Sequence, residues 1–458
     1  MAKLRFAYLS GPVDAFDVHQ KWSATKALGY FGTSHLSDFL SACVRLDAEG
    51  YIITTLPTDY SRGQVNQFLI ENRPLADDLR GLTYHVRHAV RIIQILVQLI
   101  RYRPNVLVVT AEQNFWFLLW PLRLTGVAIV PALTCTVWHK FRRPKLANRL
   151  LLFLNKHLFY RRCPDGIMVM SQDIEDQVRA MIGNRDVSIL TCLPIYSRSQ
   201  FASFGQPVLD DDRFNIFFAG RIEVNKGVFD IVEIAGRLER EYPGKFHVEM
   251  CGEGAAEAAL SAAIRAKALE SVITCHGFCE REKLSALLDG CQAVIVPTTT
   301  AFEEGFNMVC AEAALAGRPL ITSAVCPALR YVRAAAIEVP PDDVGAYYEA
   351  IVALASDGEL YEEKRRACAT VQEQFYDPAN GWGAKFVELA FRLTARPATG
   401  GRLANRRLAN DLSALDHQLH VADRGKVLRR VAVDRDQVGE EAGADGSAIG
   451  QLEDARIS

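Results

Sequence analysis

Short apolar runs alternate with longer segments of helical period along most of the chain. Runs too short for helices and bounded by Gly, Pro or polar residues predict buried strands, and apolar positions three and four residues apart predict amphipathic helices. This alternation predicts an α/β protein with parallel sheets. The predicted strands form a first series at 4–10, 50–56, 105–110, 127–133 and 166–170, and a second at 214–220, 246–252, 271–277, 293–297 and 319–323.

The polar segment 201–212, which contains Gly and Pro, separates the two series and predicts a hinge. We therefore expect two Rossmann-like domains, an N-terminal one over 1–204 and a C-terminal one over 205–375. The 458 residues suffice for two or three domains. Residues 397–458 are polar and poor in aromatic side chains, and this composition predicts a disordered tail.

Two cations follow the first strand of the second series. Arg221 and Lys226 lie in GRIEVNKG (220–227), between that strand and a predicted helix. Ligands of open parallel sheets collect at the carboxyl ends of the strands. A guanidinium can hold a phosphate with two parallel hydrogen bonds, and an ammonium acts as a point charge. The pair therefore predicts a phosphate site, and two solvated surface cations are the alternative.

Two glutamates eight positions apart follow the strand predicted at 293–297. Glu304 lies in a strand-to-helix loop, and Glu312 lies about two helical turns further along the chain. A loop that enters a helix through Gly305 offers free N–H groups to a diphosphate, and carboxylates beside it can accept hydrogen bonds from sugar hydroxyls. The alternative is that Glu304 caps the helix and Glu312 is solvated.

Together these segments resemble the retaining nucleotide-sugar glycosyltransferases of the GT-B fold. This Glu-x7-Glu family contains sucrose synthase-like, mannosyl- and polysaccharide-assembly enzymes. The resemblance is strong over about 205–345 and weaker over 1–204. The motifs that carry it are GRIEVNKG (220–227), CGEG (251–254), HGF (276–278), VPTTTAFEEGFNMVCAEA (296–313) and AGRPLITS (316–323).

The resemblance implies a role for each site residue. The two domains would face a central cleft, with helices in 376–396 crossing back to the first domain. Arg221 and Lys226 would bind the donor diphosphate, Glu312 the ribose hydroxyls, and Glu304 the hydroxyls of the transferred sugar. The remaining donor-binding residues would be Gly305, Phe306, Asn307, Met308 and, from the first domain, Gly11.

Two segments depart from the family pattern. Asn307 replaces the second Gly of the usual EGFG loop, and Asn tolerates left-handed backbone conformations better than most residues. SAVCPAL (323–329) replaces a Gly-Gly-x-x-Glu segment, so the identity of the donor sugar stays open.

Candidates in the first domain carry weaker signals. Gly11 follows the first strand, where the family has a glycine loop beside the donor phosphates; a simple turn is the alternative. Gly32 and His35 match a GGxxxH-type loop. His139 follows the strand at 127–133, where family members carry a His that faces the transferred sugar, and a structural histidine is the alternative.

Charge and cysteine content limit the ligands and the cellular compartment that we expect. The formal net charge of −2 carries no nucleic-acid signature. Eleven scattered cysteines without zinc spacing favour free thiols in a reducing cytosol, and the N-terminus lacks a signal-peptide pattern. The aspartates at 210–212 lie in the hinge, so we expect no metal and no cofactor besides the nucleoside-diphosphate sugar.

Charge is distributed unevenly. Residues 79–164 contain fourteen Lys and Arg but one acid, Glu112. Cations beside apolar helices favour contact with an anionic membrane surface; solvated cations on helices that pack against the sheet are the alternative. We therefore expect a cytoplasmic protein, peripheral on the cytoplasmic face of the membrane.

These features predict a retaining hexosyltransferase that uses a nucleoside-diphosphate sugar and a lipid-linked or saccharide acceptor. Its expected setting is the biosynthesis of cell-surface polysaccharide or glycolipid. Two alternatives stay open: a nucleotide-sugar epimerase of similar fold and a non-catalytic nucleotide-sugar-binding protein.

Overall fold

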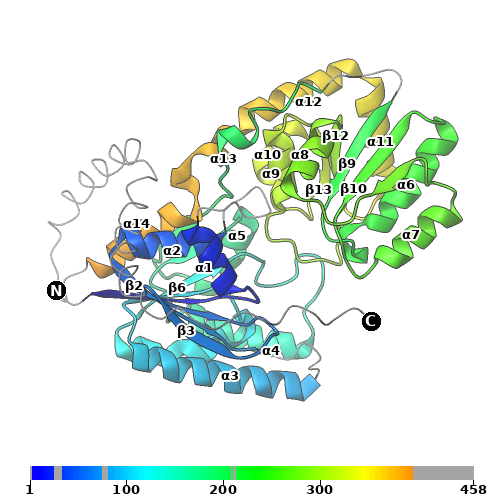
Figure 1. Ribbon diagram of the computed structural model, residues 1–458. Coiled ribbons are helices and arrows are strands. Elements are labelled where there is room, and N and C mark those ends of the chain that lie inside the picture. Colours follow the sequence, from blue (N-terminus) through cyan, green and yellow to red (C-terminus); the bar gives the residue numbers. More distant parts are fainter. Residues whose placement is uncertain (1–2, 25–33, 75–80, 208, 210–212, 396–458) are drawn as a thin grey trace, which may run out of the picture. The chain divides into compact units, whose positions relative to one another are not determined.

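The computed structural model describes residues 3–24, 34–74, 81–207, 209 and 213–395. The predicted tail at 397–458, the aspartates at 210–212 and Gly32 lie outside the described residues. The described chain is a mixed α/β structure with two sheets (Figure 1).

The first sheet has eight strands in the order β3-β4-β2-β1-β5-β6-β7-β8. All neighbouring strands are parallel except the antiparallel pair β3 and β4. The strands are β1 (Leu4–Leu9), β2 (Ala48–Thr54), β3 (Ser61–Val65), β4 (Phe68–Asn72), β5 (Val106–Val109), β6 (Ala128–Leu133), β7 (Ile167–Val169) and β8 (Ile189–Thr191).

Both faces of this sheet are buried, which explains why its central strands are apolar throughout. In β5, Leu107 and Val109 join one core cluster, and Val106 and Val108 join the other, as the two-residue period of a strand requires. The helices of this part are α1 (Ala15–Ser23), α2 (His35–Arg45), α3 (Gly81–Tyr102), η1 (Gln113–Thr125), α4 (Leu146–Leu154), η2 (Asn155–Tyr160), α5 (Gln172–Ile182) and η3 (Arg198–Gln200).

The last helix, α14 (Trp382–Thr394), packs on this first sheet. Its Trp382 and Phe386 belong to the same core cluster as Phe39 of α2 and Phe6 of β1. The indole of Trp382 lies edge-on to the ring of Tyr8, with centroids 5.9 Å apart. The chain therefore returns to its first sheet after completing the second.

The second sheet has six parallel strands in the order β11-β10-β9-β12-β13-β14. They are β9 (Phe214–Ala219), β10 (Phe246–Cys251), β11 (Ile273–Cys275), β12 (Ala293–Val296), β13 (Leu320–Ser323) and β14 (Ala336–Val339). Its helices are η4 (Val224–Lys226), α6 (Val228–Glu241), α7 (Glu257–Ala266), α8 (Arg281–Asp289), α9 (Met308–Leu315), α10 (Leu329–Val332), η5 (Arg333–Ala335), α11 (Val344–Ser356), α12 (Gly358–Val371), α13 (Glu373–Tyr376) and η6 (Pro378–Asn380).

The strand order of the second sheet changes direction between β9 and β12. From β9 the chain builds β10 and β11 on one side, and it then places β12 on the other side. Such a switch point leaves a crevice at the carboxyl ends of the two central strands. Both predicted charged clusters follow these two strands.

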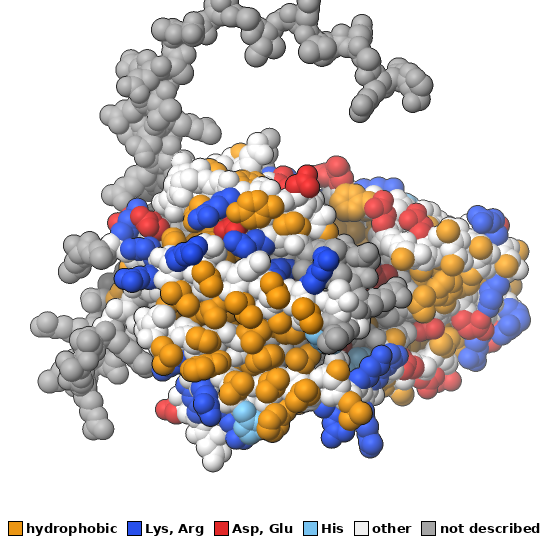
Figure 2. All heavy atoms as spheres, turned by 90° about the horizontal axis from the view of Figure 1, so that it is seen from below, with side chains coloured by type: hydrophobic (Ala, Val, Ile, Leu, Met, Phe, Trp, Pro, Cys, Tyr) orange, Lys and Arg blue, Asp and Glu red, His pale blue; other side chains and the backbone are white. Residues whose placement is uncertain are grey.

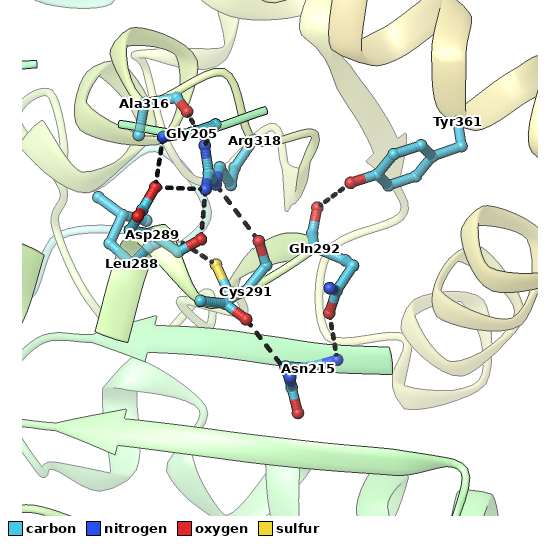
Figure 3. Close-up of polar contacts among 10 residues, drawn as sticks. Gly205, Asn215, Leu288, Asp289, Cys291, Gln292, Ala316, Arg318 and Tyr361 are labelled. Carbon is cyan, nitrogen blue, oxygen red and sulfur yellow. Dashed lines mark hydrogen bonds and ion pairs between the residues drawn. The ribbon is translucent and has the colours of Figure 1, made fainter. Parts of the chain in front are cut away.

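Arg318 fixes the opposite, amino edge of this sheet (Figure 3). The side chain is 1% exposed, and its guanidinium donates to the carbonyls of Ala316, Asp289, Cys291 and Gly205 and to the carboxylate of Asp289. These acceptors precede β12 and β13 or belong to the chain that leads to β9. The buried cation is therefore paired and well hydrogen-bonded, as burial of a charge requires.

Within the described ranges, no helix is long and apolar enough to cross a membrane.

Candidate functional site

Two loops at the carboxyl edge of the second sheet bring Lys226 and Glu304, which are 78 positions apart in the sequence, into contact. The loop after β9 passes through η4 to Gly227, and the loop after β12 leads to α9. Gly227 has a φ of 74°, and a side chain there would overlap the carbonyl of Pro297. The N–H of Thr299 donates to the carbonyl of Asn225 over 3.0 Å. Because β9 and β12 are neighbours, their two loops form one site.

The site contains a cavity of about 200 Å³. Its lining combines cationic, anionic and amide side chains with the start of α9. Five of the residues predicted from the sequence line it: Arg221, Lys226, Glu304, Asn307 and Met308.

Lys226 and Glu304 form the charged centre of the site. Nζ of Lys226 lies 2.7 Å from Oε2 of Glu304, and both side chains are nearly buried, at 13% and 11% exposure. The amide of Asn307 donates to the same carboxylate oxygen over 3.1 Å. The ring of Phe302 lies 3.8 Å from the ammonium, close enough for a cation–π contact. These contacts hold the ammonium in place before any ligand binds.

Arg221 is more accessible. Its side chain is 57% exposed and pairs with Glu223 over 2.6 Å, while its guanidinium lies 5.4 Å from the centre of the Phe302 ring. An exposed ion pair of this kind contributes little to stability, so the guanidinium can exchange Glu223 for a ligand at low cost.

The amino end of α9 completes the cavity. Asn307, Met308 and Val309 line the cavity where this helix begins. The first N–H groups of a helix lack acceptors within the helix, and they attract anions. Asn307 has a φ of 74°, a positive value that Asn adopts more readily than most residues.

Glu312 lies one turn into α9 and outside this cavity. It is buried, and its carboxylate accepts a hydrogen bond from the hydroxyl of Tyr196 over 3.3 Å. Burial raises the pKa of Glu312 to about 7, and the Tyr196 hydrogen bond opposes that rise. The same burial, together with the Glu312 charge, raises the pKa of Tyr196 well above its usual value. Glu312 is therefore not the solvated side chain of the alternative interpretation.

Gly305 and Phe306 support the loop rather than line its cavity. A Cβ on Gly305 would overlap the carbonyl of Thr134, so only glycine fits. Phe306 is 3% exposed and packs against the rings of Tyr331 and Phe375. Both residues shape the path that places Glu304.

The first-sheet candidates lie at the carboxyl ends of their strands. Gly11 follows β1 with open space beside it and no positive φ, so the backbone itself does not demand glycine there. His139 follows β6 and is partly buried; its Nδ1 accepts from the N–H of Phe141 over 3.2 Å. Nε2 of His139 is buried and has no hydrogen-bond partner among the described residues. His35 stacks on Trp382, with ring centroids 5.7 Å apart.

Three further residues near the site carry no recognisable sequence signal of their own. Phe302 supports both cations, and Tyr196 contacts Glu312 from a distant segment. Burial raises the pKa of Glu303, and the charge of His139 opposes that rise. Among the described residues, no group of three or more His, Cys, Asp or Glu side chains is arranged to hold a metal ion. All eleven cysteines are free thiols.

The second part of the chain matches a known family. The family model described as "Glycosyl transferases group 1" matches residues 199–370. A glycogen synthase of Mycobacterium tuberculosis is 33% identical over 108 residues, which cover 24% of this chain and 25% of the synthase. The match thus spans about a quarter of the length of that relative.

Solved structures match over most of the chain. A sucrose-phosphate synthase from Thermosynechococcus elongatus has a TM-score of 0.63 at 15% identity, covering 86% of this chain and 100% of that one. A structure described as trehalose-6-phosphate from E. coli bound with UDP-2-fluoro glucose has a TM-score of 0.60 at 13% identity, with coverage of 86% and 99%. Residues 199–370 therefore match the group 1 glycosyl transferases, and the chain has the two-sheet fold of the GT-B glycosyltransferases.

Proposed function

We propose that this chain is a retaining glycosyltransferase that moves a sugar, most simply a hexose, from a nucleoside-diphosphate sugar to an acceptor. The observation that carries this proposal is the Lys226–Glu304 pair, set beside the amino end of α9 at the switch point of the second sheet. It combines a cation for a diphosphate with a carboxylate for sugar hydroxyls in one cavity. The nucleotide-sugar ligand named for one structural neighbour agrees with this chemistry.

The donor diphosphate would enter between the two loops. Arg221 would leave Glu223 and hold a phosphate with its planar fork, while Lys226 and the free N–H groups of α9 neutralise the remaining charge. Stabilising the leaving diphosphate in this way lowers the barrier to breaking its bond to the sugar. We propose that these groups act without a metal ion.

Glu304 would orient the transferred sugar by accepting from its hydroxyls, and His139 would face the sugar from the first sheet. Retention would follow from attack on the face that the leaving diphosphate vacates, with a phosphate oxygen taking the acceptor proton. The residues would then contribute by holding donor and acceptor in line. Glu312 would accept from the ribose hydroxyls.

The first sheet's helices support a lipid-linked acceptor. Helix α3 exposes an apolar stripe whose members alternate in spacing by four and three residues, so that they lie in line along the helix. This stripe consists of Val86, Val90, Ile93, Val97 and Ile100, and α4 adds Leu146, Leu150 and Phe153. Figure 2 shows hydrophobic side chains gathered on this face with Lys and Arg around them.

Exposed cations stand beside these apolar side chains. We call Arg142, Arg143, Lys145 and Arg149 the α4 cation cluster; all four are exposed. Apolar side chains can enter the interface of a bilayer while cations attract anionic headgroups. We propose that this face contacts the cytoplasmic leaflet, where the enzyme would glycosylate a lipid-linked or saccharide acceptor for a cell-surface polysaccharide or glycolipid.

The test begins with a panel of nucleotide sugars, screened by thermal shift. The stabilising donor is then incubated with the protein, and NMR identifies the anomer of the sugar first released or transferred. A retaining transferase gives the anomer of the donor, and Lys226→Ala should slow the reaction at least tenfold. Inversion would contradict the mechanism, conversion to an epimer would favour the epimerase, and binding without turnover would favour a non-catalytic binding protein.

A further inference from the structure

A second cavity lies in the first domain, away from the donor site. Its volume is about 390 Å³, and it opens where β4 ends and α3 begins. Three arginines line it: Arg73, which follows β4, and Arg87 and Arg91 on α3. Val86 and Val90, the first two members of the apolar stripe, form another part of its wall.

Arg91 is buried without adequate hydrogen bonding. It is 5% exposed, and none of its three guanidinium nitrogens has a hydrogen-bond acceptor among the described residues. Its Nη2 lies 3.1 Å from Oε1 of Glu112, close enough for an ion pair but outside hydrogen-bond geometry. Glu112 is shared, because Nδ1 of His88 contacts its other oxygen. Burial lowers the pKa of Arg91; the charge of Glu112 opposes this shift, and the charge of Arg73 adds to it.

Arg73 has a similar surplus of donors. Its Nη2 lies 2.6 Å from Oε1 of Glu71, while its Nε is buried and has no partner among the described residues. Glu71 is fully buried and already accepts from the hydroxyls of Tyr51 and Tyr60. Its carboxylate also lies 3.8 Å from Nε of Arg62, so it is shared between two cations.

The charges around the cavity do not balance. The acids are Glu71 and Glu112, and the arginines are Arg62, Arg73, Arg87 and Arg91. Arg87 is exposed and has no ion pair among the described residues. Arg62 and Arg87 are exposed, whereas the partly buried Arg73 and the buried Arg91 each have one glutamate partner but keep guanidinium nitrogens without an acceptor among the described residues. Buried donors without acceptors are costly, so an anionic ligand that accepts from these guanidinium nitrogens would complete the arrangement.

We propose that this cavity binds the phosphate group of an amphiphilic ligand. Phosphate suits several guanidinium forks at once, because its oxygens accept paired hydrogen bonds from Arg73, Arg87 and Arg91. The apolar chain of the ligand would lie along Val86 and Val90 and continue on the stripe of α3. This inference deepens the membrane part of the proposed function, and it is independent of the donor site.

The test compares vesicles of equal surface charge, one set containing phosphatidic acid and the other oleate. Binding of the full chain is measured by co-flotation, with Arg87→Gln as the test variant because an exposed side chain can change without loss of the fold. Arg101→Gln, an exposed arginine on the same helix outside the cavity, is the matched control. Arg91→Gln is a second variant, with circular dichroism to check its fold.

We expect about tenfold tighter binding to phosphatidic acid, which Arg87→Gln removes and Arg101→Gln keeps. Donor binding in solution should be unchanged in both variants, so failure here would leave the proposed transferase intact. Equal affinity for both vesicle types, or an undiminished preference in Arg87→Gln, would overturn the proposal.

A soluble arm distinguishes the source of the phosphate. Inorganic phosphate is titrated into Lys226→Ala, in which the donor site is weakened, with and without Arg87→Gln. Displacement of the protein from phosphatidic acid vesicles by millimolar phosphate at constant ionic strength would keep the phosphate site but overturn the amphiphilic ligand in favour of a soluble one. Vesicle binding that resists phosphate would assign it to a lipid headgroup.

Discussion

Replacing Glu312 by Gln should stabilise the protein above pH 7 while weakening nucleotide binding. Burial raises the pKa of this carboxyl from 4.5 to about 7. A difference of about 2.5, at about 1.4 kcal/mol per pH unit, corresponds to about 3 kcal/mol lost when the buried group ionises. Gln removes that loss, and its amide oxygen can still accept from Tyr196.

The effect should depend on pH in a defined direction. Below pH 4.5 the carboxyl is protonated in both the folded and the unfolded chain, so its ionisation costs no stability. Between pH 4.5 and 7 the folded protein keeps a proton that the unfolded chain has released, and the parent protein loses stability as pH rises. The advantage of Glu312→Gln should therefore grow from near zero to about 3 kcal/mol by pH 8.

Urea unfolding, followed by circular dichroism from pH 5 to pH 8, measures this difference. Glu282→Gln, an exposed glutamate on α8, is the matched control and should show no comparable trend. A stability difference between Glu312→Gln and the parent that stays constant over this range would refute the reasoning. At pH 8, where the Glu312 carboxylate is ionised, calorimetry should show about tenfold weaker nucleotide binding in Glu312→Gln, because a charged acceptor is lost. Equal affinity at pH 8 would refute the ribose role.

Three other outcomes are expected. Lys226→Ala should lower kcat/KM at least tenfold, because loss of a charged hydrogen-bond donor costs about 1.5–3 kcal/mol. Lys283→Ala, which changes an exposed lysine, is the control and should leave kcat/KM unchanged. Unchanged turnover in Lys226→Ala would show that Lys226 does not belong to the donor site. Activity should survive EDTA, and loss that Mg²⁺ or Mn²⁺ reverses would contradict a metal-free mechanism. Changing the α4 cation cluster to Gln should weaken binding to anionic vesicles and reduce the salt dependence of that binding, without affecting donor binding. If the parent protein binds anionic vesicles no more tightly than neutral ones, the membrane contact is excluded.

The sequence pattern predicted the apolar buried strands but missed those that are polar or partly exposed. Strand β3 (SRGQV) contains Arg62 and Gly63, and β4 contains the buried Glu71, so neither has the apolar period on which the prediction relied. Strand β8 is only partly buried, and β14 contains the exposed Glu338, so neither forms a continuous buried apolar run. Pairing with neighbouring strands stabilises these segments, and no local sequence pattern records that pairing.

The sequence predicted the part of the candidate site that is built from loops after adjacent strands. It did not predict which of the site's side chains are buried. The sequence order of strand, cation loop and helix suffices to bring Lys226 near Glu304, once β9 and β12 are neighbours. It does not show that Glu312 is buried against Tyr196, because that contact joins segments 116 residues apart. It also does not show that α3 has a second, exposed apolar stripe, since both stripes satisfy the same helical period.

Arg318 has a consequence for how this sequence can change over evolution. Its guanidinium meets four main-chain carbonyls and one side chain, the carboxylate of Asp289. Carbonyl acceptors exist whatever the side chain, so the residues at 205, 291 and 316 can drift without losing these bonds. Lysine has no planar fork and could not serve the same spread of acceptors. Relatives should therefore keep arginine at 318 while the residues around it vary.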